Sequence, residues 1–164
     1  MNHMYKTDFN HIIRHPNHDI ELIKGPVVNL SLIQFFKEHL IDGIPFYYFD
    51  ILKGDQKVGK ISLRLGFNET TISNGHVGYE IDEAYQGYNY SYYALLMIKE
   101  LALEHQFPYL IVTTTEDNIA SMKMIEKAGG ELMIKGYEVP KNHIFYVLGK
   151  PKMNIYKIRI KEDY

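Results

Sequence analysis

The sequence predicts one domain of the α/β (α+β) class, with a mixed and mostly antiparallel β-sheet and flanking helices. Two segments with helical spacing alternate with β-rich runs in the middle of the chain, and hairpin signals lie on either side of them. The length of 164 residues suits one domain that buries most of the surface its unfolded form exposes. The sequence holds no internal repeat and no low-complexity tract, so we expect residues 1–164 to form a single domain.

The N-terminal segment is expected to form an irregular arm or an edge strand. Residues 1–19 are polar and rich in histidine. His11 and His15 have the i, i+4 spacing of metal ligands on a helix. Pro16 disfavours a helix at this point, and no acidic residue lies between the two histidines. The sequence therefore predicts no metal site.

A short strand and a helix are expected after the arm. Ile20–Lys24 has a strand pattern. Leu32–Ile41 has amphipathic helical spacing, and this helix would begin at Asn29 or Ser31. Asp42-Gly43 is a typical helix stop.

Two β-rich runs then predict a hairpin. They are Phe46–Leu52 and Lys57–Leu65, joined by Lys53-Gly54-Asp55-Gln56. A loop rich in glycine, asparagine and threonine follows from Gly66 to Gly75.

The centre of the chain predicts a strand, a turn, a helix, a second strand and a second helix. In order, these are Val77–Ile81, Asp82–Asn89, Ser91–His105, Tyr109–Thr115 and a helix that Asp117-Asn118 opens and Ala128-Gly129-Gly130 ends. One apolar stripe of the first helix is expected to pack on the sheet: Ala94, Leu95, Ile98, Leu101 and Ala102. A strand that leads through a glycine-containing turn into a helix is typical of an anion site, because the first helical N–H groups lack intrahelical partners.

The C-terminal part predicts a second hairpin and a last strand. Glu131–Val139 and Asn142–Leu148 read as the paired strands, with a bend at Pro140-Lys141-Asn142. Asn154–Ile160 is expected to be the last strand, and Lys161–Tyr164 a frayed tail.

Composition excludes several classes of protein and site. Apolar residues make up 46% of the chain and charged residues 23%, which is typical of a globular protein. The net charge of −2 gives no general attraction to nucleic acid or to an anionic membrane. The absence of cysteine excludes disulfides, thiolate metal sites and a cysteine nucleophile. No apolar run has the length of a signal peptide core or a membrane span, so we expect a soluble, cytoplasmic protein.

Three motifs in the central unit carry a family resemblance. They are Gln86-Gly87-Tyr88-Asn89-Tyr90-Ser91 with Ala94, Glu116-Asp117-Asn118-Ile119-Ala120-Ser121, and Glu126-Lys127-Ala128-Gly129. Together they resemble the GNAT superfamily of acyl-CoA N-acyltransferases, and most closely its branch that acetylates ribosomal-protein N-termini and, in related members, small amines. The resemblance implies the GNAT fold, in which Val77–Ile81 and Ile111–Thr115 form a central parallel pair that starts side by side and then splays.

The resemblance also implies a binding site for acetyl-CoA as cosubstrate. The family's turn reads Gln/Arg-x-x-Gly-x-Gly/Ala, and its backbone N–H groups bind the pyrophosphate. Gln86, Asn89 and Ser91 stand at the matching positions, and both substitutions suit the backbone, because Asn tolerates positive φ and Ser is small and a good N-cap. Asn118 would brace the pantetheine arm or cap its own helix. The expected coenzyme residues are Tyr79, Ile81, Gln86, Gly87, Tyr88, Asn89, Tyr90, Ser91, Asn118 and Ser121.

Two residues are candidates for proton transfer. Glu80 is the candidate base for the amine, directly or through a water, although a solvated or cross-strand paired carboxylate would have the same pattern. Many relatives carry a tyrosine acid where this chain has Ile125, and the ribosomal-protein branch suggests Ser121 as its substitute. An ordinary helix-surface serine remains the alternative for Ser121. Asp82 and Glu83 are better placed to attract a cationic substrate.

The predicted function is transfer of an acetyl group from acetyl-CoA to a primary amine, by direct attack in a ternary complex. A non-catalytic acyl-CoA sensor or scaffold is the alternative, because the usual tyrosine is missing. A nucleotide-binding module ranks last, since the chain lacks both glycine-rich nucleotide motifs. The amine acceptor stays unidentified, as no legible motif lies in the segments expected to shape its site. A homodimer stays open.

Overall fold

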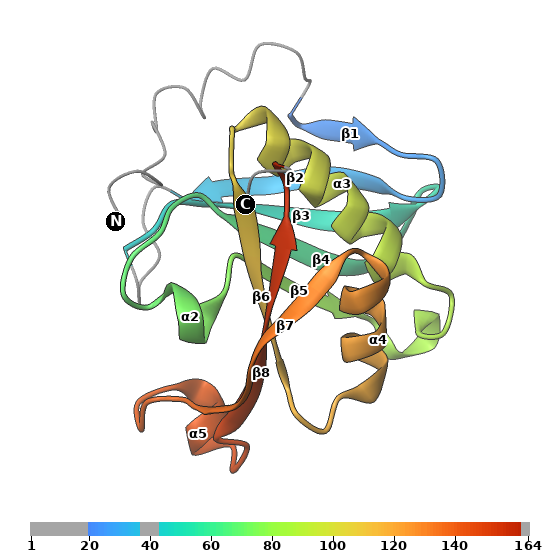
Figure 1. Ribbon diagram of the computed structural model, residues 1–164. Helices are drawn as coiled ribbons and strands as arrows, with labels where there is room; N and C mark the ends of the chain where they lie inside the picture. The colour runs from blue at the N-terminus through green and yellow to red at the C-terminus, as the bar shows by residue number, and fades with distance from the viewer. Residues whose placement is uncertain (1–19, 37–42, 162–164) are drawn as a thin grey trace.

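A computed structural model describes residues 20–36 and 43–161 of the chain (Figure 1). The strands are β1 (Leu22–Lys24), β2 (Asn29–Phe36), β3 (Phe46–Lys53), β4 (Gln56–Arg64), β5 (Val77–Ile81), β6 (Tyr109–Thr115), β7 (Gly130–Glu138) and β8 (Lys152–Arg159). The helices are α2 (Thr71–Asn74), α3 (Tyr90–Glu104), α4 (Ile119–Lys127) and α5 (Ile144–Val147), and Glu83–Tyr85 forms a turn of 3₁₀ helix. None of these helices has the length and apolar character needed to cross a membrane.

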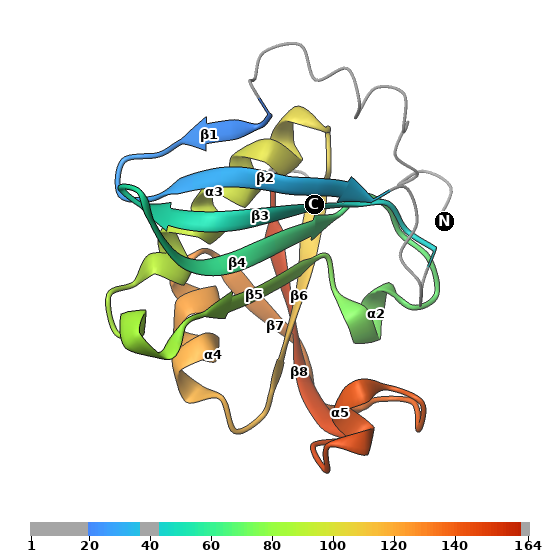
Figure 2. The ribbon, with the colours of Figure 1, turned by 180° about the vertical axis from the view of Figure 1, so that it is seen from behind.

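The described strands form two antiparallel sheets. β1 to β5 are neighbours in chain order, and the second sheet has the order β6-β8-β7. Figures 1 and 2 show α3 crossing one face of the five-stranded sheet and α4 lying beside β5 and β7. The prediction of a mostly antiparallel sheet with flanking helices is therefore confirmed.

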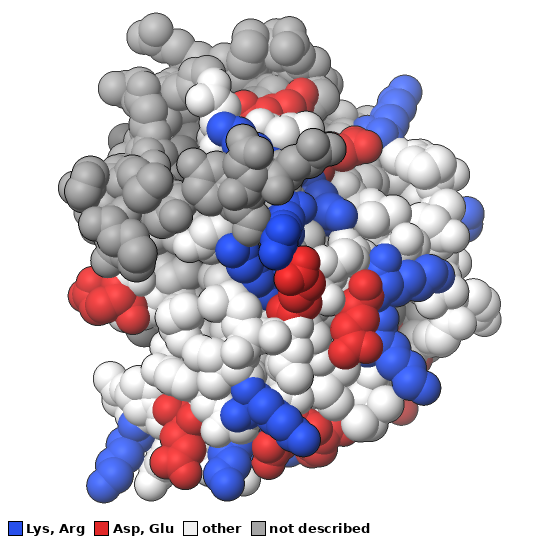
Figure 3. All heavy atoms as spheres, viewed as in Figure 1, with Lys and Arg blue, Asp and Glu red and all other residues white. Residues whose placement is uncertain are grey.

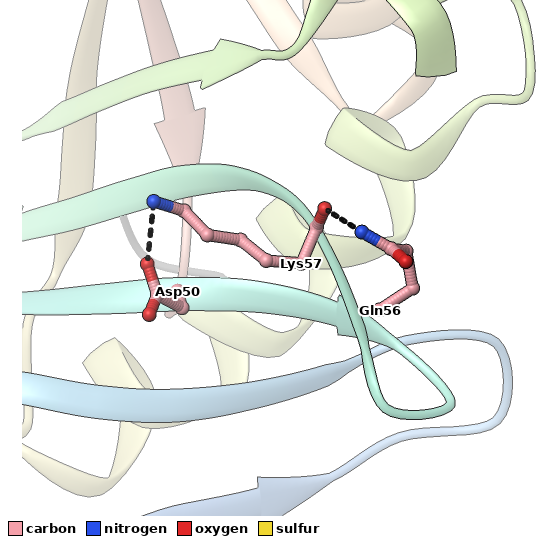
Figure 4. Close-up of polar contacts among 3 residues, drawn as sticks. All are labelled: Asp50, Gln56 and Lys57. Carbon is pink, nitrogen blue, oxygen red and sulfur yellow. Dashed lines mark hydrogen bonds and ion pairs between the residues drawn. The ribbon is translucent and has the colours of Figure 1, made fainter.

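The β3–β4 hairpin lies where the sequence predicts it. Gly54 has a φ of 59° in the connecting turn, a left-handed conformation that glycine adopts without steric cost. Beside the turn, Lys57 Nζ lies 3.5 Å from Asp50 Oδ1, and Gln56 Nε2 donates to the carbonyl oxygen of Lys57 at 3.3 Å (Figure 4). The ion pair is partly exposed, with 44% of the Lys57 side chain and 28% of the Asp50 side chain accessible to solvent. Exposed pairs contribute about 0–1 kcal/mol, so the hairpin depends mainly on its buried face.

The core lies between the five-stranded sheet and α3. Alternate residues of β3 and β4 are buried, among them Phe49, Ile51, Ile61 and Leu63. The predicted stripe of α3 faces them, and all its members are at most 1% exposed. Each fully buried side chain of this size contributes about 1.5–3 kcal/mol. This contact fixes α3, and with it the turn that precedes α3.

β5 and β6 meet at one point and then diverge, as the sequence analysis expects (Figure 2). The backbone N–H of His76 donates to the carbonyl oxygen of Ile111 at 2.7 Å, and the N–H of Ile111 donates to His76 Nδ1 at 2.8 Å. Because a backbone N–H can only donate, Nδ1 is an acceptor and Nε2–H donates to Gly66 O at 3.0 Å. His76 is fully buried and holds together the end from which the two strands splay.

The helix expected from Asn29 or Ser31 is wrong where the structure describes it. Residues 29–36 form strand β2, and its pairing with β3 shifts register between Leu32 and Gln34. This β-bulge breaks the alternation of apolar and polar residues, so the run looks helical in the sequence. The rest of that predicted helix, residues 37–41, and its stop at Asp42 lie outside the described residues. So do the arm with His11 and His15, and residues 162–164 of the tail.

The prediction of a second hairpin is correct for its first strand and wrong for its second. β7 forms as expected, but it pairs with β8, and residues 142–148 contain helix α5 in place of a strand. His143 caps α5, because its Nδ1 accepts from the N–H of Phe145 at 3.1 Å. The predicted loop from Gly66 to Gly75 likewise contains the short helix α2.

Candidate active site

The turn before α3 presents unsatisfied backbone N–H groups. Asn89 is the N-cap of α3 with a φ of 63°, so the left-handed conformation expected for this position is present. Gly87 has a φ of 91°. The first hydrogen bond of the helix runs from Tyr93 N to Asn89 O, which leaves the N–H groups of residues 90–92 outside the intrahelical ladder. The cap is thus Asn89, and Ser91 lies inside the helix rather than at the cap expected for it.

A cavity of about 360 Å³ lies against this turn and is called the turn cavity here. Its walls come from the end of β5, the segment from Tyr85 to Ser91 and the first turns of α4. All the predicted coenzyme residues except Tyr88 line it, and so does Glu80. The described lining residues include no lysine and no arginine, so an anion in this cavity would depend on the backbone N–H groups and the dipole of α3.

Tyr88 and its neighbours form an aromatic cover beside the cavity. Tyr88 is 60% exposed, and its ring stacks on that of Tyr90 at a centroid distance of 5.5 Å. Further along α3, the Nζ atom of Lys127 lies 4.3 Å from the centroid of the Tyr92 ring. In these contacts the tyrosine rings pack beside the first turns of α3.

Asn118, Ser121 and Tyr79 form a connected polar group between β5 and α4. Asn118 Oδ1 accepts from the N–H of Ser121 at 3.1 Å, which makes Asn118 the N-cap of α4. The hydroxyl groups of Tyr79 and Ser121 are hydrogen-bonded to each other. Burial raises the pKa of the Tyr79 hydroxyl, and the bond with Ser121 opposes this rise. Tyr79 thus keeps its proton at neutral pH.

A second cavity of about 360 Å³ fills the space where β5 and β6 diverge, and is called the gap cavity here. Its walls include Gly78 of β5, Thr113 and Thr115 of β6, and Phe145 of α5. Tyr79, Asn118 and Ser121 line both this cavity and the turn cavity. The hydroxyl pair therefore lies where the two cavities adjoin.

A third cavity of about 380 Å³ lies between α2 and α5 and is called the α2–α5 cavity here. It shares Asn74, Thr113 and Phe145 with the gap cavity, so the two cavities adjoin at β6. Arg64, at the end of β4, lines it from the sheet side. The sequence analysis did not single out Arg64, because nothing local marks the end of a strand as part of a site.

Glu80 is exposed on β5. It pairs in register with Lys60 of β4, on the face of the sheet opposite the core. Among the described residues that line the three cavities, Glu80 is the one carboxylate. Asp82 and Glu83 are exposed in the turn and line none of the three.

The charged side chains on one face of the molecule do not form a patch of one sign. On the face shown in Figure 3, acidic and basic side chains are interspersed.

A family model and several solved structures match this chain. The model of the acetyltransferase (GNAT) domain matches residues 25–131, which is more than half of the chain. An acetyltransferase of the GNAT family from Bacillus anthracis is 21% identical with a TM-score of 0.56, and the alignment covers 70% of this chain and 67% of that one. A putative ribosomal-protein-serine acetyltransferase from Vibrio cholerae is 16% identical with a TM-score of 0.60, over 88% of this chain and 98% of that one.

The ribosomal L7/L12 α-N-protein acetyltransferase RimL, solved with coenzyme A, is also similar. It is 18% identical with a TM-score of 0.52, over 70% of this chain and 62% of that one. A search of the curated proteins gave no match. At these low identities the solved structures show only that the fold is shared. Membership of a family rests on the family model, which matches residues 25–131. The protein belongs to the GNAT acetyltransferase family.

Proposed function

We propose that the protein transfers an acetyl group from acetyl-CoA to a primary amine, by direct attack in a ternary complex. One observation carries the proposal: in a GNAT fold, the cavity at the α3 turn adjoins a second cavity in the gap between β5 and β6. The first suits the pyrophosphate of a coenzyme, and the second suits a thioester and an incoming amine. The RimL structure with coenzyme A and a microcin C7 self-immunity acetyltransferase with acetyl-CoA give precedent within the fold.

The coenzyme would bind mainly to backbone groups. Its pyrophosphate would accept hydrogen bonds from N–H groups of the segment from Gln86 to Ser91. Its pantetheine arm would lie along the diverging edges of β5 and β6 and satisfy their backbone groups as an added strand would. Tyr79, Ile81 and Asn118 would contact the arm near its sulfur. This arrangement needs no basic side chain, which agrees with the composition of the turn cavity.

The chemistry needs a neutral amine and a proton for the departing thiolate. Glu80, directly or through a water, would take a proton from the ammonium group, and the nitrogen would attack the thioester carbon. A backbone N–H near Ile81 would stabilise the oxyanion. When the C–S bond breaks, Ser121 Oγ would give its proton to sulfur, and the extra proton on the attacking nitrogen would pass through solvent to restore the Ser121 hydroxyl. Tyr79, by donating to Ser121 Oγ, would turn the serine proton toward the sulfur, so we assign Tyr79 a positioning role.

The acceptor class is open between a small-molecule amine and a peptide N-terminus, the second being the substrate of the ribosomal-protein branch that the motifs resemble most. A non-catalytic acyl-CoA sensor remains the second candidate, because Ile125 stands where many relatives have a tyrosine.

Release of free CoA separates the two candidates. The protein is incubated with acetyl-CoA and, one at a time, polyamines, aminoglycosides, amino acids and peptides with free N-termini. A thiol reagent reports CoA without background, because the chain contains no cysteine. We expect amine-dependent release with at least one class. Tight acetyl-CoA binding without amine-dependent release would favour the sensor.

A further inference from the structure

Two short helices, far apart in the sequence, meet at the α2–α5 cavity. Figures 1 and 2 show α2 and α5 on the same side of β6. His143 Nε2 lies 3.2 Å from the carbonyl oxygen of Ser73, which joins the start of α5 to α2. Because Nδ1 of His143 already accepts from Phe145 N–H, Nε2 carries the proton and donates it to that oxygen. His143 is therefore a structural tie that holds α5 beside the cavity.

Phe145 forms an aromatic wall that the α2–α5 cavity shares with the gap cavity. Its ring stacks on the His143 ring, with a centroid distance of 5.6 Å and an interplanar angle of 22°. Phe145 also packs against a small buried cluster that includes Ile111 and Met153. A side chain held in this way loses little freedom when a ligand packs on it. Phe145 is thus a preorganised apolar surface between the two cavities.

The apolar wall continues from Phe145 into the α2–α5 cavity. Pro140 and Ile144 line the cavity beside Phe145. Ile144 is 59% exposed, so most of its apolar surface faces solvent. Removing such surface from water is favourable, roughly in proportion to the area covered. A ligand with an apolar body would therefore gain free energy along this wall.

Several polar groups of the cavity are already used within the protein. Thr70 Oγ1 donates to Asn68 Oδ1 at 2.6 Å, and Ser73 Oγ donates to Thr70 O at 3.2 Å. These two hydroxyl groups have no proton left to donate to a ligand. Arg64 also lines the cavity and already has an interaction of its own.

The charges of the lining disfavour an acceptor with a second ammonium group. The described residues that line the α2–α5 cavity and the gap cavity include no Asp and no Glu. Lys150, which lines the gap cavity, has its Nζ 3.2 Å from Asp117 Oδ2. Glu80 lines the turn cavity, where it would serve the reacting ammonium group. A second ammonium group would lose its water without gaining a carboxylate, whereas an apolar body has no such cost.

From this we propose that the acceptor carries one amine on an apolar body, and that Ile144 and Phe145 bind this body while the amine enters the gap cavity. This inference rests on the proposed function, since it names the substrate class of the same site. A cavity of about 380 Å³ has room for an aliphatic chain or an aromatic group. Ile144 and Phe145 are here specificity-determining residues and take no part in proton transfer.

Pairs of amines of equal size test the proposal. Pentylamine is compared with putrescine, and hexylamine with cadaverine, by CoA release at equal concentrations of reactive free amine. Within each pair, an ammonium group replaces one terminal methyl group. We expect kcat/KM to be about tenfold or more higher for the monoamine, because the lining has no carboxylate to receive the second charge. Equal or better turnover of the diamines would overturn the proposal while leaving the acetyltransferase function intact.

Peptides distinguish the two sources of such an amine, a free alkylamine and a peptide N-terminus with an apolar side chain. A peptide with N-terminal phenylalanine is compared with one that has N-terminal lysine and is otherwise the same. The class of compound with the higher kcat/KM identifies the source. A preference for the lysine peptide would overturn the proposal.

Substitutions at the wall assign the preference to it. Ile144→Glu places a carboxylate at the cavity, and because Ile144 is largely exposed, we expect the fold to tolerate it. It should raise kcat/KM for the diamines and reverse the preference, whereas Ile144→Gln should slow the monoamines without favouring the diamines. Val147→Glu is the matched control, because Val147 is 70% exposed on the same helix and lines none of the three cavities. The same preference in Ile144→Glu and Val147→Glu would overturn the assignment.

A binding measurement decides the question if no amine is acetylated. In the presence of CoA, binding of N-pentylacetamide is compared with that of N-acetylputrescine by NMR titration, on the parent and on Ile144→Glu. Stronger binding of the uncharged amide, lost in the variant, supports the apolar wall even if the protein is a sensor. Equal binding of the two compounds to the parent overturns it.

Discussion

The turn cavity and the α2–α5 cavity are built in different ways. The turn cavity takes most of its wall from one continuous stretch, residues 79–91, whose shape depends on the positive φ of Gly87 and Asn89. The α2–α5 cavity collects its wall from the end of β4, from α2, from β6 and from the chain around α5. A site made of local backbone can be predicted from its turn residues. A site made of side chains from separate segments depends on tertiary packing, and the α2–α5 cavity was not predicted from the sequence.

The largest effect is expected where the turn cavity depends on backbone shape. Proline at position 89 has no N–H and fixes φ near −65°, whereas Asn89 has a φ of 63°. We expect Asn89→Pro to weaken acetyl-CoA binding about 100-fold or more, measured by calorimetry. Asn89→Gly is the control, since glycine keeps the positive φ and should keep the affinity. Parent affinity in Asn89→Pro would remove this turn from the coenzyme site.

The next effect concerns the base. Glu80→Gln keeps the shape of the side chain but cannot take a proton from the ammonium group. We expect kcat to fall by about 100-fold and to recover in part at high pH, where free amine is abundant. A pH–rate profile measures both features. An unchanged kcat across that profile would mean that Glu80 is only an exposed residue of β5.

Asn118 tests whether one residue acts as a helix cap and as a coenzyme contact. Asn118→Ala removes the hydrogen bond to Ser121 N–H and should lower the free energy of unfolding by about 1 kcal/mol. We expect it also to weaken acetyl-CoA binding. Asn118→Asp keeps an acceptor for the cap but has no amide donors. If this variant binds acetyl-CoA with the parent affinity, Asn118 is only a cap.

A smaller effect is expected at the hydroxyl pair between the turn and gap cavities. Tyr79→Phe keeps the ring but removes the hydrogen bond to Ser121, so we expect kcat to fall by about threefold to tenfold with an unchanged KM for acetyl-CoA. Ser121→Ala should lower kcat mildly, and adding Tyr79→Phe to it should have no further effect. Losses that multiply in the double variant would show that Tyr79 does not act through Ser121.

The smallest effect is a pH dependence of stability at the α2–α5 cavity, which His143 lines. Burial lowers the pKa of His143 below 6.5, although its bond to Ser73 opposes this. The unfolded chain then binds more protons than the folded one as pH falls below 6.5, so the stability that His143 contributes is present above that pH and decreases below it. Thermal unfolding of the parent and of His143→Gln, measured between about pH 5 and pH 8, checks this. The melting temperature of the parent should exceed that of His143→Gln by less at acid pH than at neutral pH. A difference that is the same at every pH would contradict the assignment of His143 as a neutral side chain hydrogen-bonded to Ser73.

The parts of the fold that the sequence predicted well are those with consistent local signals. The β3–β4 hairpin has a glycine turn and alternating strands, and the segment from β5 to α4 has clear turns and caps. All five residues predicted for the α3 stripe are buried, and Met97, which was not predicted, is buried with them. In these regions the local conformational preferences agree with the tertiary packing. The pattern of apolar and turn residues was therefore enough to predict the elements.

The errors have physical causes in particular residues. Strand β2 was mistaken for a helix because the register shift between Leu32 and Gln34 breaks its alternating pattern. Helix α5 was mistaken for a strand because its N-cap is His143, whose Nδ1 accepts from the N–H of Phe145. Neither has a strong sequence signature. The role of His76 in joining β5 to β6 was missed because its partners, Ile111 and Gly66, lie far from it in sequence. The contact between Tyr79 and Ser121 was missed for the same reason.

The central claim is that acetyl-CoA binds across the α3 turn and along the gap between β5 and β6. Amide hydrogen exchange with and without acetyl-CoA tests it most directly, because the claim concerns backbone N–H groups. The account predicts new protection in residues 86–92, in β5 and at the end of β6, with little change in β1 to β3. Saturating acetyl-CoA that leaves residues 86–92 unprotected, while it protects another part of the chain, would contradict the account.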